Sequence, residues 1–260
     1  MRLLSASPLT PKLNSLFCGF LLFAGSLHSE DLVVVVSGGF DEHDTFSEME
    51  SFLRASLGDV AEVRSGDFSN FYSEETQAAL EGADLVVIAR TSKSKDYADG
   101  VGLGYNTLSI PVVVLSSYIA RSESGLLGWY NGTVSDFRET TSGSEVDVTE
   151  AGIELFGGSV DEKRDWHESP GDTFNAAGLG DPGDGEVLAE IEGGILVARW
   201  RKGDAPGNPF AAGVDVFPGE RLFFALDNDP RSTYLDQEEF VNLTPAGREA
   251  LVKALLAIRP

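Results

Sequence analysis

Short apolar runs alternate with segments of helical periodicity along the first half of the chain. Four runs, at residues 32–36, 60–63, 85–89 and 110–115, are rich in valine and leucine. Such a composition is typical of strands that are buried on both faces of a parallel sheet. Apolar residues recur at helical spacing between the first two runs, at residues 46–57. Because the runs alternate with helical segments, they predict right-handed crossovers between parallel strands and an α/β fold.

Two further helices carry start signals. Ser73 precedes two glutamates, which predicts an N-cap residue followed by an acidic first turn. Thr244 and Pro245 predict an N-cap and a first helical position before a final amphipathic helix. Residues 96–109 are expected to include a helix, although their glycines form a G-x-G-x-G pattern. That pattern lacks the spacing and the preceding strand of a dinucleotide site, so we interpret it as a loop.

The second half of the chain has a different pattern. Residues 128–219 are rich in Gly, Asp and Pro and contain short alternating runs. The runs at 187–191 and 195–200 are joined by Glu-Gly-Gly, which predicts an antiparallel β-hairpin that is added to the main sheet or packed beside it. Residues 222–226 form another buried strand in this interpretation. We therefore predict a mostly parallel sheet with helices on both faces and a hairpin elaboration.

The N-terminal segment differs from the rest in charge and hydropathy. Residues 1–29 contain Arg2 and Lys12, no acidic residue and an apolar stretch at 13–25, which is the pattern of a signal peptide. The alternative is a membrane anchor, but the stretch is shorter than the roughly 20 residues that a spanning helix needs. We expect a single domain at residues 30–260, exported to the periplasm or the extracellular space. The only cysteine, Cys18, lies in the segment to be removed, so this domain would contain no disulfide.

The charge of the chain restricts its partners. With 42 acidic and 19 basic residues, the formal net charge is −23. Nucleic acid and anionic membrane surfaces are therefore unfavourable partners. The acidic residues are dispersed along the chain, which favours a strongly solvated surface over an acidic binding tail. We expect no integral membrane span after signal removal, and the sequence leaves the oligomeric state open.

The order of residues 32–39, 85–90 and 110–117, with Pro111 near the start of the last run, resembles the class I glutamine amidotransferase-like superfamily. This superfamily includes trehalose-utilisation-type domains and uncharacterised exported bacterial proteins, and the resemblance implies a flavodoxin-like sheet. In its catalytic members the strand matching 110–115 ends in a cysteine flanked by glycines. Here Ser116 stands at that position between Leu115 and Ser117, so the permissive backbone of a nucleophile elbow is missing. Glutaminase activity is disfavoured, and we favour a noncatalytic domain over an enzyme.

Polar residues follow the predicted strands, at the sheet edge where ligands bind in open α/β folds. They supply hydroxyls, backbone amides, cations and aromatic rings, which suit a small polar ligand; that this ligand is a carbohydrate follows from the resemblance alone. Two alternatives remain open, since Trp129 would also suit a cover over the sheet and Arg121 would also suit a pair with an acid. The candidate ligand-binding residues are Ser37, Gly38, Arg90, Ser117, Tyr118, Arg121, Trp129 and Asn131.

Two chemical alternatives use other residues. A hydrolase would need Ser116 as nucleophile with a histidine base, His43 or His167, or a metal-bound water near His43. Asp227 and Asp229 offer a carboxylate pair for a divalent cation such as calcium. No other cofactor is predicted. A histidine in an acidic loop is more often a solvated surface residue, so both alternatives rank below ligand binding.

Overall fold

The computed structural model describes residues 32–38, 45–58, 60–90, 92–133, 138–141, 144–160, 162–167, 173–176, 180–226 and 243–260. Its contacts divide the chain into two units, Met1–Glu30 and Asp31–Pro260, and every described residue belongs to the second. The predicted signal peptide lies outside the described residues, so the export of the protein stays a prediction. Among the described helices, none combines the length and the apolar character required to cross a bilayer.

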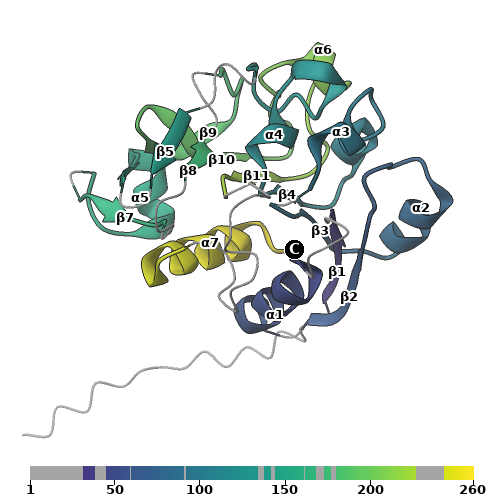
Figure 1. Ribbon diagram of the computed structural model, residues 1–260, viewed down its shortest axis with the longest axis horizontal. Helices are drawn as coiled ribbons and strands as arrows, with labels where there is room; N and C mark the ends of the chain where they lie inside the picture. Colours follow the sequence, from purple (N-terminus) through teal and green to yellow (C-terminus); the bar gives the residue numbers. More distant parts are fainter. Residues whose placement is uncertain are drawn as a thin grey trace, which may run out of the picture. The chain divides into compact units, whose positions relative to one another are not determined.

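Nine of the described strands form one sheet, in the order β2-β1-β3-β4-β11-β10-β9-β6-β7. The first five neighbours run parallel, and they are drawn at the centre and right of Figure 1. Valine predominates in β1, β3 and β4, and β3 and β4 are buried along their whole length. Their bounds are β1 Leu32–Ser37, β2 Val60–Gly66, β3 Leu85–Ile88, β4 Val112–Val114 and β11 Arg221–Phe224.

The remaining four strands of this sheet are antiparallel to their neighbours. A tight turn at Glu192 and Gly193, both with positive φ, joins β9 to β10. This is the predicted hairpin, and it continues the sheet directly beyond β11. A separate two-stranded sheet pairs β5 with β8. The bounds are β5 Arg138–Thr141, β6 Glu145–Val148, β7 Arg164–Asp165, β8 Thr173–Ala176, β9 Glu186–Ile191 and β10 Gly194–Trp200.

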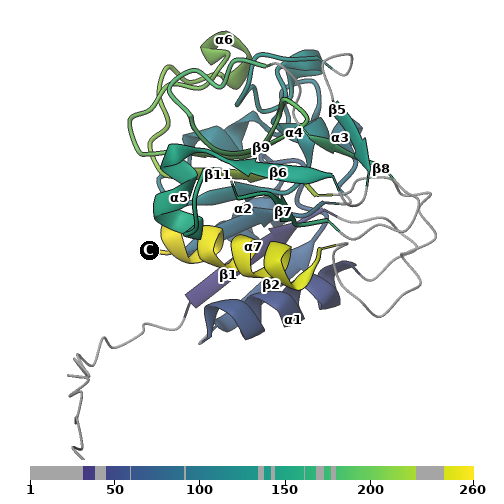
Figure 2. The ribbon, with the colours of Figure 1, turned by 90° about the vertical axis from the view of Figure 1, so that its left-hand side faces the viewer.

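Helices cover both faces of the sheet (Figures 1 and 2). On one face α7 (Pro245–Ile258) lies between α1 (Thr45–Leu57) and α5 (Glu150–Phe156) and contacts both. Thr244 caps α7 by accepting a hydrogen bond from Gly247 N at 3.1 Å. The other face carries α3, α4, α6 and the 3₁₀ helix η1, while α2 lies beside β2. Their bounds are α2 Glu74–Leu80, α3 Ser94–Tyr97, η1 Leu103–Thr107, α4 Ser117–Ala120, η2 Glu123–Gly125 and α6 Pro209–Ala212.

The predicted α/β class is confirmed, and one feature of the prediction requires correction. The sheet is mixed, parallel in its first half and antiparallel in its second, whereas the sequence predicted a mostly parallel sheet. The extra antiparallel strands β6 and β7 have four and two residues. β7 is too short to show a period, and β6 alternates polar and apolar residues, so neither stands out in the way that the continuous apolar runs of β3 and β4 do. The order of the parallel strands is consistent with a flavodoxin-like sheet.

Arg221 stands where the parallel and antiparallel halves meet. It is the first residue of β11, it is 0% exposed, and its guanidinium donates hydrogen bonds to backbone carbonyls of η1 and of the strand ends, including Asn106 at 3.0 Å and Leu108 at 2.7 Å. Burial lowers the pKa of Arg221 to about 9, which leaves the side chain protonated at neutral pH. The buried cation therefore fixes η1 to the amino end of β11.

Candidate functional site

The strand register brings several predicted residues to one edge of the sheet. Ser37 pairs with Ile88, and Ile88 pairs with Val114. Arg90 and Ser116 each follow by two residues, so the carboxyl ends of β1, β3 and β4 lie side by side. Beyond β4, Leu226 N donates to Leu115 O at 3.2 Å, which places the end of β11 at the same edge. This is the position at which open α/β sheets bind ligands.

Ser116 lies at the centre of this carboxyl edge. Its backbone is extended, with φ −121° and ψ 115°, and the residue is 0% exposed. A nucleophile elbow depends on a sharp, strained turn that exposes the side chain, and Ser116 has neither property. The Ser116 hydroxyl is buried and forms no hydrogen bond with any residue that the structure describes. It is a polar group that the described part of the fold leaves unsatisfied.

A cluster of buried hydroxyls holds the end of β1. Ser37 Oγ lies 2.5 Å from the Tyr97 hydroxyl, and Ser92 Oγ donates to Ser37 O at 3.2 Å. Burial raises the pKa of Tyr97 and of Tyr105, so both phenols stay neutral. Sequence reasoning missed Ser92 and both tyrosines as parts of this edge, because Ser37 and Tyr97 lie 60 residues apart and no local pattern links them.

Gly38 has a conformation that few other residues adopt. Its φ is +109°, and a Cβ atom at this position would lie 1.5 Å from Ser92 Oγ. The tight approach of Ser92 to the end of β1 therefore requires glycine. The close contact with Ser92 is therefore a structural reason for the glycine that follows the first strand.

The two arginines assigned to the site are both buried. Arg90 is 5% exposed and Arg121 is 7% exposed. Arg121 pairs with Glu123 at 3.4 Å and lies over the Tyr118 ring at 5.5 Å from its centroid. Burial lowers the pKa of Arg121. The pair with Glu123 is the structural alternative that the sequence left open for Arg121.

The backbone of Trp129 is bonded to α4, with its N–H donating to Ala120 O at 2.8 Å, but its side chain points toward the amino end of β11. It is 0% exposed, and its indole nitrogen donates to Asn106 Oδ1 at 2.7 Å. Its ring packs against Trp200, which pairs with Arg221 at the amino end of β11. Trp129 thus covers the sheet near the edge opposite to Ser116, and the structure does not bring the two residues together.

The two residues that follow Trp129, Tyr130 and Asn131, form hydrogen bonds to other segments of the chain. Asn131 is exposed, and its backbone N–H donates a hydrogen bond to Asp181 O at 2.8 Å. The Tyr130 hydroxyl donates to Ser117 O at 2.6 Å. Ser117 is itself 0% exposed and begins α4. Of the predicted ligand-binding residues, Ser37, Gly38, Arg90 and Ser117 are therefore the ones that the structure places at or next to the ends of β1, β3 and β4.

The residues proposed for hydrolysis and metal binding lie largely outside the described part of the chain. His43, Asp227 and Asp229 are all in this group. In the ranges that the structure does describe, no cluster of three or more His, Cys, Asp or Glu residues could hold a metal ion.

The other histidine, His167, lies at the carboxyl end of β11. It is 2% exposed, its Nε2 is 3.3 Å from Ala225 O, and its backbone forms a β-bridge with Leu243. Burial lowers the pKa of His167 to about 4, and the bond to Ala225 offsets only part of this effect. The imidazole is therefore neutral at physiological pH.

Comparison with known proteins adds a structural likeness. No protein-family model matches the chain, and no curated protein matches it. A crystal structure of a ThuA-like protein from Parabacteroides merdae ATCC 43184 is similar, with 14% identity, 88% of this chain and 90% of that chain covered, and a TM-score of 0.39. A ThuA-like protein from Bacteroides uniformis ATCC 8492 is also similar, with 10% identity, 86% and 89% covered, and a TM-score of 0.42.

Proposed function

We propose that residues 30–260 form an exported, noncatalytic amidotransferase-like domain that binds a small polar ligand at the carboxyl edge of its parallel strands. The observation that carries this proposal is the buried Ser116 hydroxyl, which has no hydrogen-bond partner among the described residues. A buried polar group in this state costs about 1–3 kcal/mol. A ligand oxygen or nitrogen that bonds to Ser116 would recover that cost on binding.

The surroundings of Ser116 favour a polar ligand of modest charge. Arg90 adds a buried cation two residues beyond the end of β3, and the cluster around Ser37 adds neutral hydroxyls. Cations and hydroxyls of this kind bond well to hydroxyl and carbonyl oxygens. A carbohydrate supplies such oxygens, and we propose it as the ligand class on the strength of the resemblance described above.

Two features support a binding role over catalysis. Ser116 has a relaxed, extended backbone, so it lacks the strained strand-to-helix turn on which a serine nucleophile of this fold type sits. The proposed domain also contains no cysteine that would serve a glutaminase mechanism. Neither observation favours the hydrolase alternative, and we do not adopt it.

Titration of the full chain with glycans and with single neutral sugars tests the proposal. A glycan array is followed by calorimetry on each sugar that binds, with wild type and the Ser116→Ala variant. We expect binding by the wild type and affinity reduced by about fivefold or more in Ser116→Ala, as for the loss of one hydrogen bond. Ser56→Ala is the matched control, since Ser56 is only partly buried and lies on α1, which contains none of the candidate ligand-binding residues. Absence of binding to every glycan would remove the carbohydrate proposal.

A further inference from the structure

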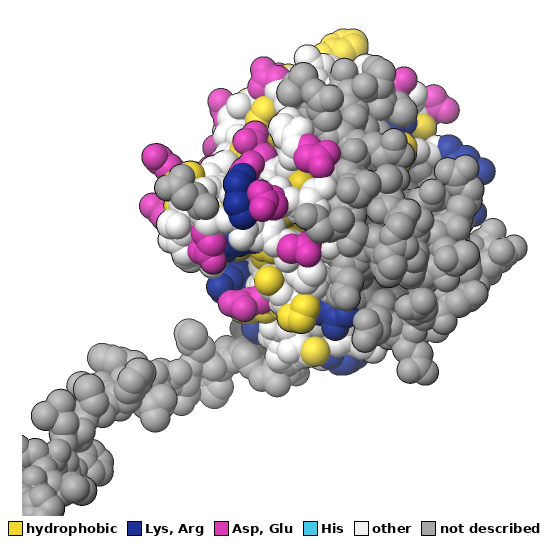
Figure 3. Space-filling view, turned by 60° about the vertical axis from the view of Figure 1, so that its left-hand side comes forward, with side chains coloured by type: hydrophobic (Ala, Val, Ile, Leu, Met, Phe, Trp, Pro, Cys, Tyr) yellow, Lys and Arg dark blue, Asp and Glu magenta, His cyan; other side chains and the backbone are white. Residues whose placement is uncertain are grey.

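A groove of about 400 Å³ lies between α5, β7 and α7 and shares no residue with the carboxyl edge. Acidic and basic side chains mix with apolar ones on the face shown in Figure 3, which carries this side of the molecule. Its volume falls within the range of small-molecule sites. The groove is lined by Phe156, Gly158, Glu162, Lys163, Arg164, Asp165, Trp166, Ala246, Glu249, Ala250 and Lys253.

One wall of the groove is a single face of α7. Ala246, Glu249, Ala250 and Lys253 recur at helical spacing, so their side chains point to the same side. The side chains of the two alanines are small, so they leave space between the longer side chains of Glu249 and Lys253. Lys253 pairs with Glu249 at 2.7 Å. This wall therefore presents a fixed ion pair beside a small apolar surface.

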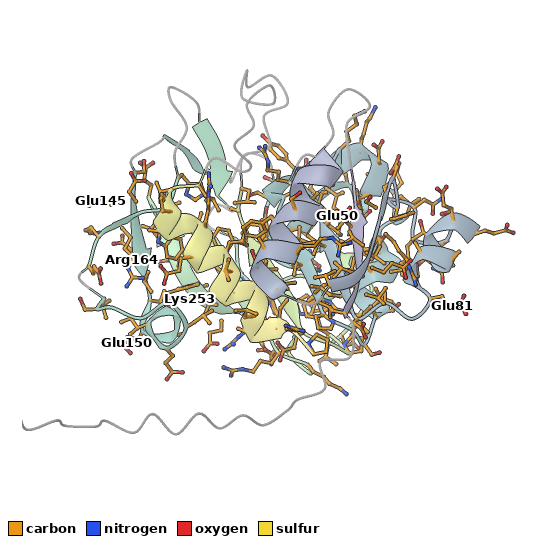
Figure 4. All side chains as sticks on the ribbon, turned by 90° about the horizontal axis from the view of Figure 1, so that it is seen from below. Glu50, Glu81, Glu145, Glu150, Arg164 and Lys253 are labelled. Carbon is orange, nitrogen blue, oxygen red and sulfur yellow. The ribbon has the colours of Figure 1, made fainter. Side chains whose placement is uncertain are left out.

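The opposite wall contributes a second ion pair. Arg164 of β7 pairs with Glu162 at 3.2 Å. Figure 4 shows Arg164 and Lys253 on the same side of the molecule, next to α5. Both cations also bond to the C-terminal end of α5, because Lys253 Nζ donates to Phe156 O at 3.1 Å and Arg164 Nη2 donates to Gly157 O. These bonds anchor both cations.

The charges are arranged by depth. The side chains of Arg164 and Lys253 are 14% and 38% exposed, whereas those of Glu162 and Glu249 are 53% and 66% exposed. The Lys253 ammonium, with a smaller contribution from Arg164, lowers the pKa of Glu249, so this carboxylate is charged at neutral pH. The cations thus lie deeper in the groove and the carboxylates stand at its rim.

The floor between the two walls is aromatic. Phe156 and Trp166 contact each other edge to face, with their centroids 5.0 Å apart, and are 5% and 1% exposed. Trp166 also stacks on Phe224 of β11. The floor is therefore apolar and closely packed, and among the residues that line the groove only the edge of Phe156 and the exposed Ala246 of α7 offer apolar surface to a ligand.

From these contacts we propose that the groove binds a small zwitterion with an apolar side chain, such as an aliphatic α-amino acid or dipeptide. The carboxylate of the ligand bonds to Arg164 and Lys253, and its ammonium group bonds to Glu162 or Glu249 at the rim. The aliphatic side chain packs against Ala246 and the exposed edge of Phe156. A ligand with only one of the two charges would leave one carboxylate or one cation of the groove without a new partner, so it would bind more weakly.

Calorimetry on the full chain tests the charge requirement. The probes are L-leucine, leucyl-leucine, 4-methylpentanoate, which lacks the amine, and 3-methylbutylamine, which lacks the carboxylate. We expect L-leucine or leucyl-leucine to bind at least about tenfold more tightly than either singly charged probe, as for the loss of a charge-assisted bond. Equal affinity for all probes, or no binding of the two zwitterions at millimolar concentration, would overturn the proposal.

A pair of variants on α7 tests the location. Ala246→Leu fills the groove from an exposed position, and Ala257→Leu makes the same change at another exposed position of α7 that does not line the groove. We expect Ala246→Leu to abolish zwitterion binding and Ala257→Leu to preserve it, with similar thermal stability in both. Unchanged binding in Ala246→Leu would contradict the assignment. Ser116→Ala should also leave zwitterion binding unchanged, because the two sites are independent.

Discussion

Two buried serines at the carboxyl edge give opposite predictions for the same substitution. Ser37 and Ser116 are both 0% exposed, but Ser37 Oγ lies 2.5 Å from the Tyr97 hydroxyl and Ser116 Oγ has no bond to a described residue. Ser37→Ala removes a buried hydrogen bond and leaves Tyr97 with one partner fewer. It should lower the free energy of unfolding by about 1–3 kcal/mol. Ser116→Ala removes an unsatisfied group, so it should leave this free energy unchanged or raise it by up to about 1 kcal/mol.

Chemical denaturation of both variants beside the wild type measures this difference. Both substitutions delete one oxygen atom from a fully buried serine, so transfer and cavity effects largely cancel and the difference in hydrogen bonding remains. We expect Ser116→Ala to exceed Ser37→Ala in stability by about 1–4 kcal/mol, or by about 2–16 °C in Tm for a domain of this size. Equal destabilisation by the two variants would show that the Ser116 hydroxyl has a hydrogen-bond partner within the folded chain, which is the opposite of what we infer.

Three further predictions concern residues that hold the fold at the two ends of the strands. Because the pKa of His167 falls to about 4 on folding, the unfolded chain binds more protons between pH 4 and 6.5, and the free energy of unfolding should drop by about 3 kcal/mol as the pH is lowered through this window. His167→Gln should flatten that part of the stability–pH curve, and an unchanged slope would contradict the assignment. Arg221→Met should lower the free energy of unfolding in urea by about 3 kcal/mol, since it leaves buried carbonyls without a donor; a loss below about 1 kcal/mol would show that the carbonyls find other partners. Gly38→Ala should destabilise by at least about 2 kcal/mol more than Gly58→Ala, which shares the positive φ but has no heavy atom within 4 Å of the added Cβ, and equal Tm values for the two would rule out the predicted clash.

The parallel half of the fold could be predicted because its strands are continuous apolar runs, which stand out although β3 and β4 have only four and three residues. The runs that became β1, β3 and β4 are valine-rich, and parallel strands with helical crossovers admit few arrangements. The antiparallel half gave weaker signals. The strand β6 alternates over only four residues, and α5 has seven residues with Gly152 in its interior. Both elements depend on tertiary packing for their stability.

The same difference applies to the carboxyl edge. Ser37, Arg90 and Ser116 were predictable as neighbours because each follows a parallel strand. Trp129 follows Ser116 closely in the sequence, which predicts a place at the same edge. The chain after α4 turns back, however, with Leu127 N donating to Ile119 O. The Trp129 side chain therefore packs toward the amino end of β11. The partner of Ser37, Tyr97, lies in a short helix whose position relative to the sheet no sequence period encodes.

The proposed function depends on the Ser116 hydroxyl, which forms no hydrogen bond with a described residue and is therefore available to bond to a ligand. The most direct test is the affinity of the full chain for its best-binding sugar, measured by calorimetry for wild type and for the Ser116→Ala variant. We expect the variant to bind at least about fivefold more weakly while unfolding at an equal or higher denaturant concentration. A variant that binds the sugar as tightly as the wild type would contradict the proposed function.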